Sequence, residues 1–181
     1  MRGPSGYDLI SRINHWLIAI AIIGMLALGL FFEFGGLARE DKRWLVDLHK
    51  SVGVLVLIYG VWRVLWRVIQ GFPKSDDNTM PQWQEIASKI VHWALLAGIL
   101  IMPISGVVAN IFNGRSIAVF NWFSIPAQAE IGWLGSVAGY AHKYVGFTLA
   151  FIVAIHIAAA LKHHFVDRDS VLIRMVQGRA D

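Results

Sequence analysis

Two histidines in the last apolar stretch of the chain, His142 and His156, have the residue type and the spacing to bind metal-containing cofactors. They stand fourteen residues apart in HKYVGFTLAFIVAIH. An α-helix turns about 100° per residue, so this spacing returns both side chains to nearly the same helix face, about 21 Å apart along the axis. That length is most of the ~30 Å hydrocarbon thickness of a bilayer. Because a neutral imidazole is an axial ligand of haem iron, the pair predicts two haems at two membrane depths and a path for electrons.

The composition is that of a membrane protein. Apolar residues make up 56% of the 181 residues and charged residues 15%, whereas soluble domains carry about 25% charged residues. The net charge of +4 does not indicate nucleic-acid binding, because the basic residues lie at the ends of apolar stretches, where they favour anionic lipid headgroups. The chain has no cysteine, which excludes disulfides, cysteine-ligated iron–sulfur clusters and the covalent attachment of c-type haem. Any haem is therefore held non-covalently.

Four apolar stretches are long enough to cross the hydrocarbon core as helices: about 13–32, 47–69, 86–113 and 137–161. The first contains a histidine and lacks a small-residue cleavage site, so we interpret it as a span rather than a signal peptide. The sequence therefore predicts an all-α membrane protein. We expect one domain over residues 1–181, built as a four-transmembrane-helix bundle.

The distribution of basic residues favours a topology with both termini in the cytoplasm. In that orientation ten lysines and arginines lie on the inner side and six on the outer side, as the positive-inside rule requires. Residues 71–82, which are polar and contain two prolines, are then an inner loop. Residues 114–136 are apolar but broken by proline and glycine, and we expect them to lie over the outer end of the bundle at the membrane interface.

The remaining histidines of the spans fall at the same two depths. His49 lies with His142 near the outer surface, which gives the two ligands that a six-coordinate haem needs. Three histidines lie near the inner surface: His15, His92 and His156. His156 is assigned as one ligand of the inner site because it shares a helix face with His142. Spacing alone leaves either His15 or His92 as its partner.

The second span carries further residues on the face of its histidine. Gly53 and Gly60 follow His49 by four and eleven residues, and glycine lets a planar cofactor approach the backbone closely. Close helix–helix packing is the alternative explanation for both glycines. Arg63 lies on the same face at the inner depth, where we expect it to pair with a haem propionate. Arg67 is better placed to snorkel to the lipid headgroups.

The chain resembles the bacterial cytochrome b561 family over nearly its whole length. The matching segments are INHWLIAIAIIGMLALGL, LHKSVGVLVLIYGVWRVLWR, HWALLAGILIMPISG, RSIAVFNWFSIPA and AIHIAAALKHHFVDRDSVLIRM. The resemblance implies a multi-pass protein of the bacterial inner membrane whose four helices hold two b-type haems. It also implies that His15 and His156 ligate the inner haem and that His49 and His142 ligate the outer haem.

The same resemblance implies electron transfer between a periplasmic-side donor and quinone. The family includes a class that oxidises superoxide and reduces ubiquinone, so superoxide is a candidate donor and ubiquinone the expected substrate. His92 is then left for a hydrogen bond or for a quinone site near the inner haem. His163 and His164, just beyond the last span, are more typical of interface anchors, but with His92 they can also supply the protons that quinone reduction needs.

Cations on the outer side bear on the identity of the donor. They are Arg39, Lys42, Arg43, Lys50, Arg115 and Lys143. We expect them to form a positive funnel that steers a small anion such as superoxide; propionate pairing and solvated loop charge are the alternative explanation. Two other classes of function stay open, a membrane-anchor relay subunit for a periplasmic redox partner and a transporter without haem.

Overall fold

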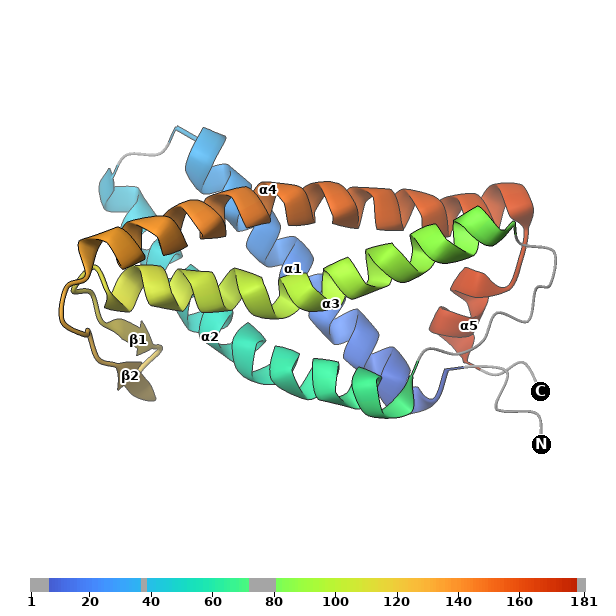
Figure 1. Cartoon of the computed structure of the whole chain (residues 1–181), viewed down its shortest axis with the longest axis horizontal. Helices are drawn as coiled ribbons and strands as arrows, with labels where there is room; N and C mark the ends of the chain where they lie inside the picture. The colour runs from blue at the N-terminus through green and yellow to red at the C-terminus, as the bar shows by residue number, and fades with distance from the viewer. Residues whose placement is uncertain (1–6, 37–38, 72–80, 179–181) are drawn as a thin grey trace.

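The computed structural model describes residues 7–36, 39–71 and 81–178. Among these residues, four helices are long and apolar enough to cross a membrane: α1 (Leu9–Phe34), α2 (Arg39–Gln70), α3 (Gln82–Ile111) and α4 (Gly132–Lys162). Each helix packs against the next one in sequence and α4 also contacts α1, so that α2 and α4 lie on opposite sides of the bundle (Figure 1). The predicted four-helix membrane bundle is confirmed.

The helices extend past the apolar stretches of the sequence at every end except the carboxyl end of α3, which stops at Ile111 and not at residue 113. α2 has 32 residues, which at 1.5 Å per residue is about 48 Å, well above the ~30 Å of hydrocarbon that a span must cross. Its polar first turns therefore project beyond the bilayer on the outer side. At the inner side α1 begins at Leu9 because Asp8 caps it, with Oδ1 accepting from the Ser11 backbone N–H at 3.2 Å. Most of the predicted inner loop, residues 72–80, lies outside the described residues.

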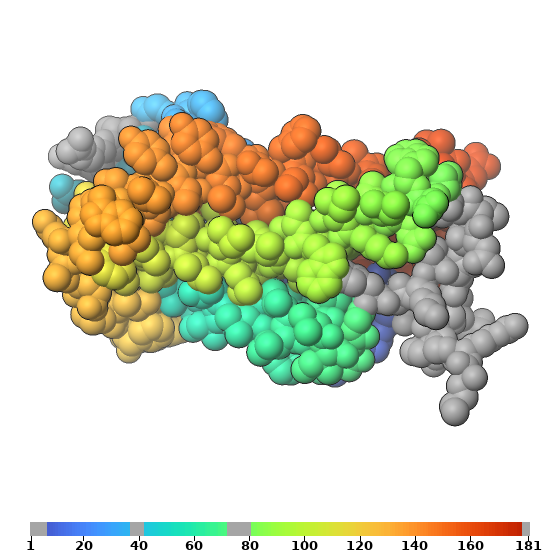
Figure 2. All heavy atoms as spheres, viewed as in Figure 1, coloured from blue at the N-terminus to red at the C-terminus, as the bar shows by residue number. Residues whose placement is uncertain are grey.

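The buried core is small, and most large apolar side chains face outward. The central cluster is made by Ile18, Ile22, Val56, Leu96, Ile99 and Leu149. Ile20, Ile69 and Phe151 are 71%, 77% and 67% exposed, a pattern expected where lipid tails surround the protein. Figure 2 shows α3 and α4 in contact along much of their length, with the outer segment covering one end of the bundle.

The outer segment contains a β-hairpin that was not expected from the sequence. Its strands, β1 (Ile117–Val119) and β2 (Phe123–Ile125), pair antiparallel. Ser51 of α2 holds the hairpin, because its hydroxyl donates to the Ala118 carbonyl at 3.1 Å and accepts from the Phe120 N–H at 3.0 Å. Ile117 and Val119 are 2% and 0% exposed. The segment thus lies over the outer end of α2, as expected, but is fastened there by burial and hydrogen bonds.

The chain after α4 folds back onto the start of α1. α4 continues into a π-helical turn, η1 (His163–Asp167), and a short helix α5 (Val171–Gln177) follows. Trp16 donates its indole N–H to the Met175 carbonyl at 3.1 Å, and the Arg12 guanidinium donates to the Val176 carbonyl. The first and last described helices therefore meet on one side of the bundle, as an even number of spans requires (Figure 1).

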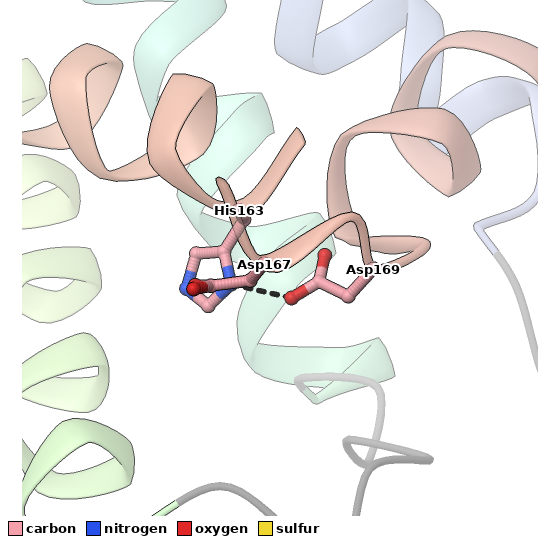
Figure 3. Close-up of side chains that lie close together, drawn as sticks. All are labelled: His163, Asp167 and Asp169. Carbon is pink, nitrogen blue, oxygen red and sulfur yellow. Dashed lines mark hydrogen bonds and ion pairs between the residues drawn. The ribbon is translucent and has the colours of Figure 1, made fainter. Parts of the chain in front are cut away.

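The turn between α4 and α5 is fixed by a cluster of paired side chains. Figure 3 shows Asp167 and Asp169 beside the His163 imidazole, whose Nδ1 is 2.5 Å from an Asp169 carboxylate oxygen. The Lys162 ammonium lies 2.6 Å and 2.8 Å from the two carboxylate oxygens of Asp167. Although three metal-ligating side chains converge here, both carboxylates are paired within the protein. We interpret the cluster as a structural clasp.

Candidate haem-binding sites

Two histidines from opposite helices meet near the outer end of the bundle. The ring centroids of His49 in α2 and His142 in α4 are 6.2 Å apart, and the ring planes are inclined at 85°. Phe32 of α1 packs edge-on against the His49 ring with centroids 5.6 Å apart. We call His49 and His142 the outer pair.

Three histidines meet near the inner end. His15 of α1 and His156 of α4 have ring centroids 6.3 Å apart, at 57°. His92 of α3 is closer to His156, with centroids 5.4 Å apart and planes at 86°. We call His15, His92 and His156 the inner cluster. The structure therefore gathers five histidines into the two groups that the helical spacing predicts.

These separations can be compared with those of two imidazoles on one iron. An imidazole nitrogen binds a first-row transition metal at about 2.0–2.1 Å and lies about 1.1 Å from its ring centroid, so two rings on opposite sides of one metal have centroids about 6.3 Å apart. The outer pair at 6.2 Å and His15 with His156 at 6.3 Å match this value. His92 and His156, at 5.4 Å, are closer than such a pair. The residues present fit one bis-histidine haem in each group.

Helix α3 orients the ring of His142. The His142 Nδ1 is 2.8 Å from the Met102 carbonyl oxygen, and since a carbonyl only accepts hydrogen bonds, Nδ1 carries the proton. Nε2 is then the nitrogen with the free lone pair, the form in which histidine binds metals. The Nδ1 of His49, in contrast, is buried with no hydrogen-bond partner among the described residues.

A cavity of about 160 Å³ adjoins the outer pair and is lined mainly by apolar side chains of all four helices. Gly53 lines this cavity, where the sequence predicted a close approach to a cofactor. Gly60 does not line it. A Cβ at Gly60 would lie 2.6 Å from Cγ2 of Ile99, so close packing of α2 on α3, the alternative explanation, accounts for this glycine in the structure.

Gly106 of α3 is a site residue that was not identified from the sequence. A Cβ at this position would lie 2.9 Å from Cε1 and 3.0 Å from Nδ1 of His142, so only glycine leaves room for the ring where it stands. Gly106 follows His92 by fourteen residues, which places it on the same face of α3 one haem depth away. That spacing, already used for α2 and α4, is the signal that would have found it.

Arg63 is buried near the inner cluster, at 6% exposure. Its Nε and Nη1 atoms have no hydrogen-bond partner among the described residues. A buried guanidinium is costly without an anion, and a haem propionate would supply one, which is the pairing predicted for this residue.

Arg67 was expected to snorkel, but it is 4% exposed and donates to the Gly71 carbonyl at 2.8 Å. That expectation is wrong, because the guanidinium bonds to the Gly71 carbonyl at the end of α2 and does not extend to the lipid headgroups.

The outer cations differ in their surroundings. Lys50 lines the cavity beside the outer pair. Lys143 is ion-paired with Glu33 at 2.6 Å, with both side chains well exposed, and Lys42 donates to a backbone carbonyl of α1 at 3.3 Å. Arg43 and Arg115 are exposed, and the side chain of Arg39 lies outside the part of the chain that the structure describes.

The three quinone candidates have different partners in the structure. His92 lies in the inner cluster, with its Nδ1 donating to the Ser88 carbonyl at 2.6 Å. His163 belongs to the clasp with Asp169. His164 packs against the ring of Phe165, with centroids 4.7 Å apart. His92 is therefore the candidate that the fold places beside the inner histidines.

Comparisons with known proteins identify the family of the chain. The family model for prokaryotic cytochrome b561 matches residues 6–178. The chain is 36% identical to cytochrome b561 homolog 2 of Escherichia coli strain K12, over 96% of this chain and 92% of that protein. It is 26% identical to the probable superoxide oxidase CybB of Yersinia pestis, over 90% of each. It is also 25% identical to cytochrome b561 homolog 1 of Escherichia coli, over 91% of this chain and 93% of that protein. The chain belongs to the prokaryotic cytochrome b561 family, b-type haem proteins of the bacterial inner membrane that transfer electrons.

Proposed function

We propose that the protein holds two haems and passes electrons through the membrane, from a donor on the outer side to a quinone on the inner side. His49 and His142 would ligate the outer haem iron, and His15 and His156 the inner one. The observation that carries the proposal is the pair of ring separations, 6.2 Å and 6.3 Å, at the two ends of the bundle. Each matches the distance expected for two imidazoles on one iron.

When bound, each haem supplies a one-electron couple at its iron. The residues of the chain determine the chemistry that this redox couple performs. Two histidines holding each haem iron, as proposed, would leave no open coordination site, which would favour electron transfer over oxygen binding at iron. The apolar lining of the outer cavity limits water. Arg63 offers a buried positive charge to a propionate at the inner end.

Superoxide and ubiquinone are the donor and acceptor that we propose. Two superoxide ions would each lose one electron to become dioxygen, and ubiquinone would take up both electrons with two protons to become ubiquinol. The similarity to a protein named probable superoxide oxidase supports the donor. Lys50 supports it as well, because this residue lines the cavity beside the outer pair and carries a positive charge that attracts anions. We propose that His92, as a member of the inner cluster, binds the quinone or passes it a proton.

The test combines haem content with the kinetics of haem reduction. A pyridine haemochrome assay of the purified protein is expected to give two b haems per chain. Stopped-flow mixing with superoxide is expected to reduce haem rapidly, at a rate that falls as salt rises, and added ubiquinone is expected to reoxidise it. One haem per chain would refute the two-site assignment. Slow reduction that salt does not change would refute superoxide steering.

A relay subunit for a periplasmic redox protein is the second candidate function. Two observations favour it. The Lys143 charge is neutralised by Glu33, which weakens attraction of a small anion, and Trp122 and Phe123 of the hairpin are 70% and 47% exposed on the outer side, where aromatic side chains suit protein contacts. Under this function the haems would be reduced by a protein donor and not by superoxide in the stopped-flow assay.

A further inference from the structure

We propose that Ser105 of α3 is a positioning residue for His142 and that its hydroxyl lowers the redox potential of the outer haem through the Nδ1–H of this ligand. The inference rests on the proposed function, in that His142 is taken as an axial ligand. It goes further by assigning control of the outer potential to a side chain that never touches the haem iron.

The geometry around the ligand nitrogen carries the inference. The Ser105 hydroxyl donates to the Met102 carbonyl at 2.8 Å, the same carbonyl that accepts from the His142 Nδ1–H at 2.8 Å. Ser105 Oγ is also 3.3 Å from that Nδ1. Because the hydroxyl hydrogen is committed to the carbonyl, an oxygen lone pair of Ser105 is directed at the Nδ1–H. The ligand N–H thus has two acceptors, both from α3.

A serine inside a membrane helix often bonds only to a carbonyl one turn earlier in its own helix. Ser105 makes that bond, and its 8% exposure would be explained by it alone. The difference here is the second partner of the hydroxyl, a ring nitrogen from another helix. Gly106, the next residue, is what allows it, since any Cβ there would fill the space of the His142 ring. Successive residues of α3 thus admit the ring and bind its Nδ1–H.

Hydrogen-bond acceptors on the outer nitrogen of a metal-bound imidazole raise the basicity of the ligating nitrogen. A more basic ligand stabilises ferric over ferrous iron and lowers the potential. In the described part of the chain the Nδ1 of His49 has no acceptor. His142 is therefore the ligand through which the protein adjusts the outer haem, and removal of one of its two acceptors is expected to raise the potential of that haem alone.

The experiment is a potentiometric titration of the purified protein, with electron paramagnetic resonance of the ferric low-spin signals as a second readout. In Ser105→Ala the Fe(III)/Fe(II) ratio of the outer haem, measured at a fixed potential, is expected to fall about three- to tenfold. At 59 mV per tenfold, this fall corresponds to a rise in the midpoint potential of roughly 30–60 mV. The inner haem is expected to keep its midpoint. Ser105→Thr, which retains the hydroxyl, is expected to restore both the midpoint and the spectrum.

Ser88→Ala is the matched control. It removes a hydroxyl 3.2 Å from the Nδ1 of His92 on the same helix, beside a histidine that is not a ligand in the proposed pairing, so the outer midpoint is expected to stay. An unchanged outer midpoint in Ser105→Ala overturns the inference, as does an equal shift of both haems. If Ser105→Ala loses the outer haem, full retention in Ser105→Thr supports the hydroxyl, and loss in both variants overturns it.

Haem content separates this inference from the function on which it rests. His142→Ala is expected to lose one haem of two. If His142→Ala keeps both haems, the ligand assignment fails and the inference falls with it. If His142→Ala loses the outer haem while Ser105→Ala leaves all potentials unchanged, the proposed function stands and only the role of Ser105 is refuted.

Discussion

Gly106→Ala is expected to weaken the outer haem selectively. The added Cβ would lie 2.9 Å from Cε1 and 3.0 Å from Nδ1 of His142, whereas non-bonded carbon atoms sit about 3.5–4.0 Å apart. The ring must therefore move by about half an ångström or more, and the hydrogen bond to the Met102 carbonyl, now 2.8 Å, opposes a free adjustment. Overpacking of this kind costs about 1–3 kcal/mol. If this whole free-energy cost falls on haem binding by His142, it lowers the haem affinity by about 5- to 150-fold.

The assay is haem content per chain, followed by redox titration to tell the two haems apart. Gly106→Ala is expected to retain the inner haem and to lose most of the outer one on purification. Gly24→Ala is the control, because a Cβ on this glycine of α1 meets nothing within 4 Å. Full outer haem with an unchanged spectrum and midpoint in Gly106→Ala would show that α3 does not hold the His142 ring in the bound protein.

Three further predictions concern the ligands and the inner site. His142→Ala is expected to leave only the inner haem and His156→Ala only the outer one, as read by haemochrome and by which midpoint survives; loss of both haems in each variant would mean that the sites do not fold independently. His92→Ala is expected to keep both haems and to slow ubiquinone reduction measured by haem reoxidation. If His92→Ala instead loses the inner haem while His15→Ala keeps it, His92 is the ligand. Arg63→Gln is expected to lower the inner midpoint by about 60 mV, a tenfold shift towards ferric iron, since a nearby cation favours the ferrous form; an unchanged inner midpoint would place the arginine away from the propionates.

The helical repeat predicted most of the candidate site because side chains on one long helix follow a local periodicity. Fourteen residues return a side chain to its own face, so His142 with His156 and His49 with Arg63 could be placed without knowing how the helices pack. The partner of His156 could not be chosen in this way. His15 and His92 lie at one depth on different helices, and only their packing sets the separations of 6.3 Å and 5.4 Å from His156.

The outer hairpin escaped prediction for a different reason. β1 and β2 have three residues each, too few for the alternation that identifies a strand. Much of what fastens the hairpin comes from Ser51, which precedes its partners Ala118 and Phe120 by 67 and 69 residues. Such a contact has no local sequence signal. Most ends of the helices were underestimated for a related reason, because polar turns outside the bilayer do not raise the hydropathy of a stretch. The carboxyl end of α3 was instead overestimated, since the helix ends at Ile111 and not at residue 113.

Both ends of the bundle gather histidines but differ in electrostatics, and under the proposed function this difference bears on the direction of electron flow. At the outer end His142, the proposed ligand, donates its Nδ1–H to α3, which would favour ferric iron and a low potential. At the inner end Arg63 brings a buried positive charge, which favours ferrous iron and a high potential. With haems bound as proposed, both effects make transfer from the outer to the inner haem downhill. The fold would then direct electrons inward before any quinone binds.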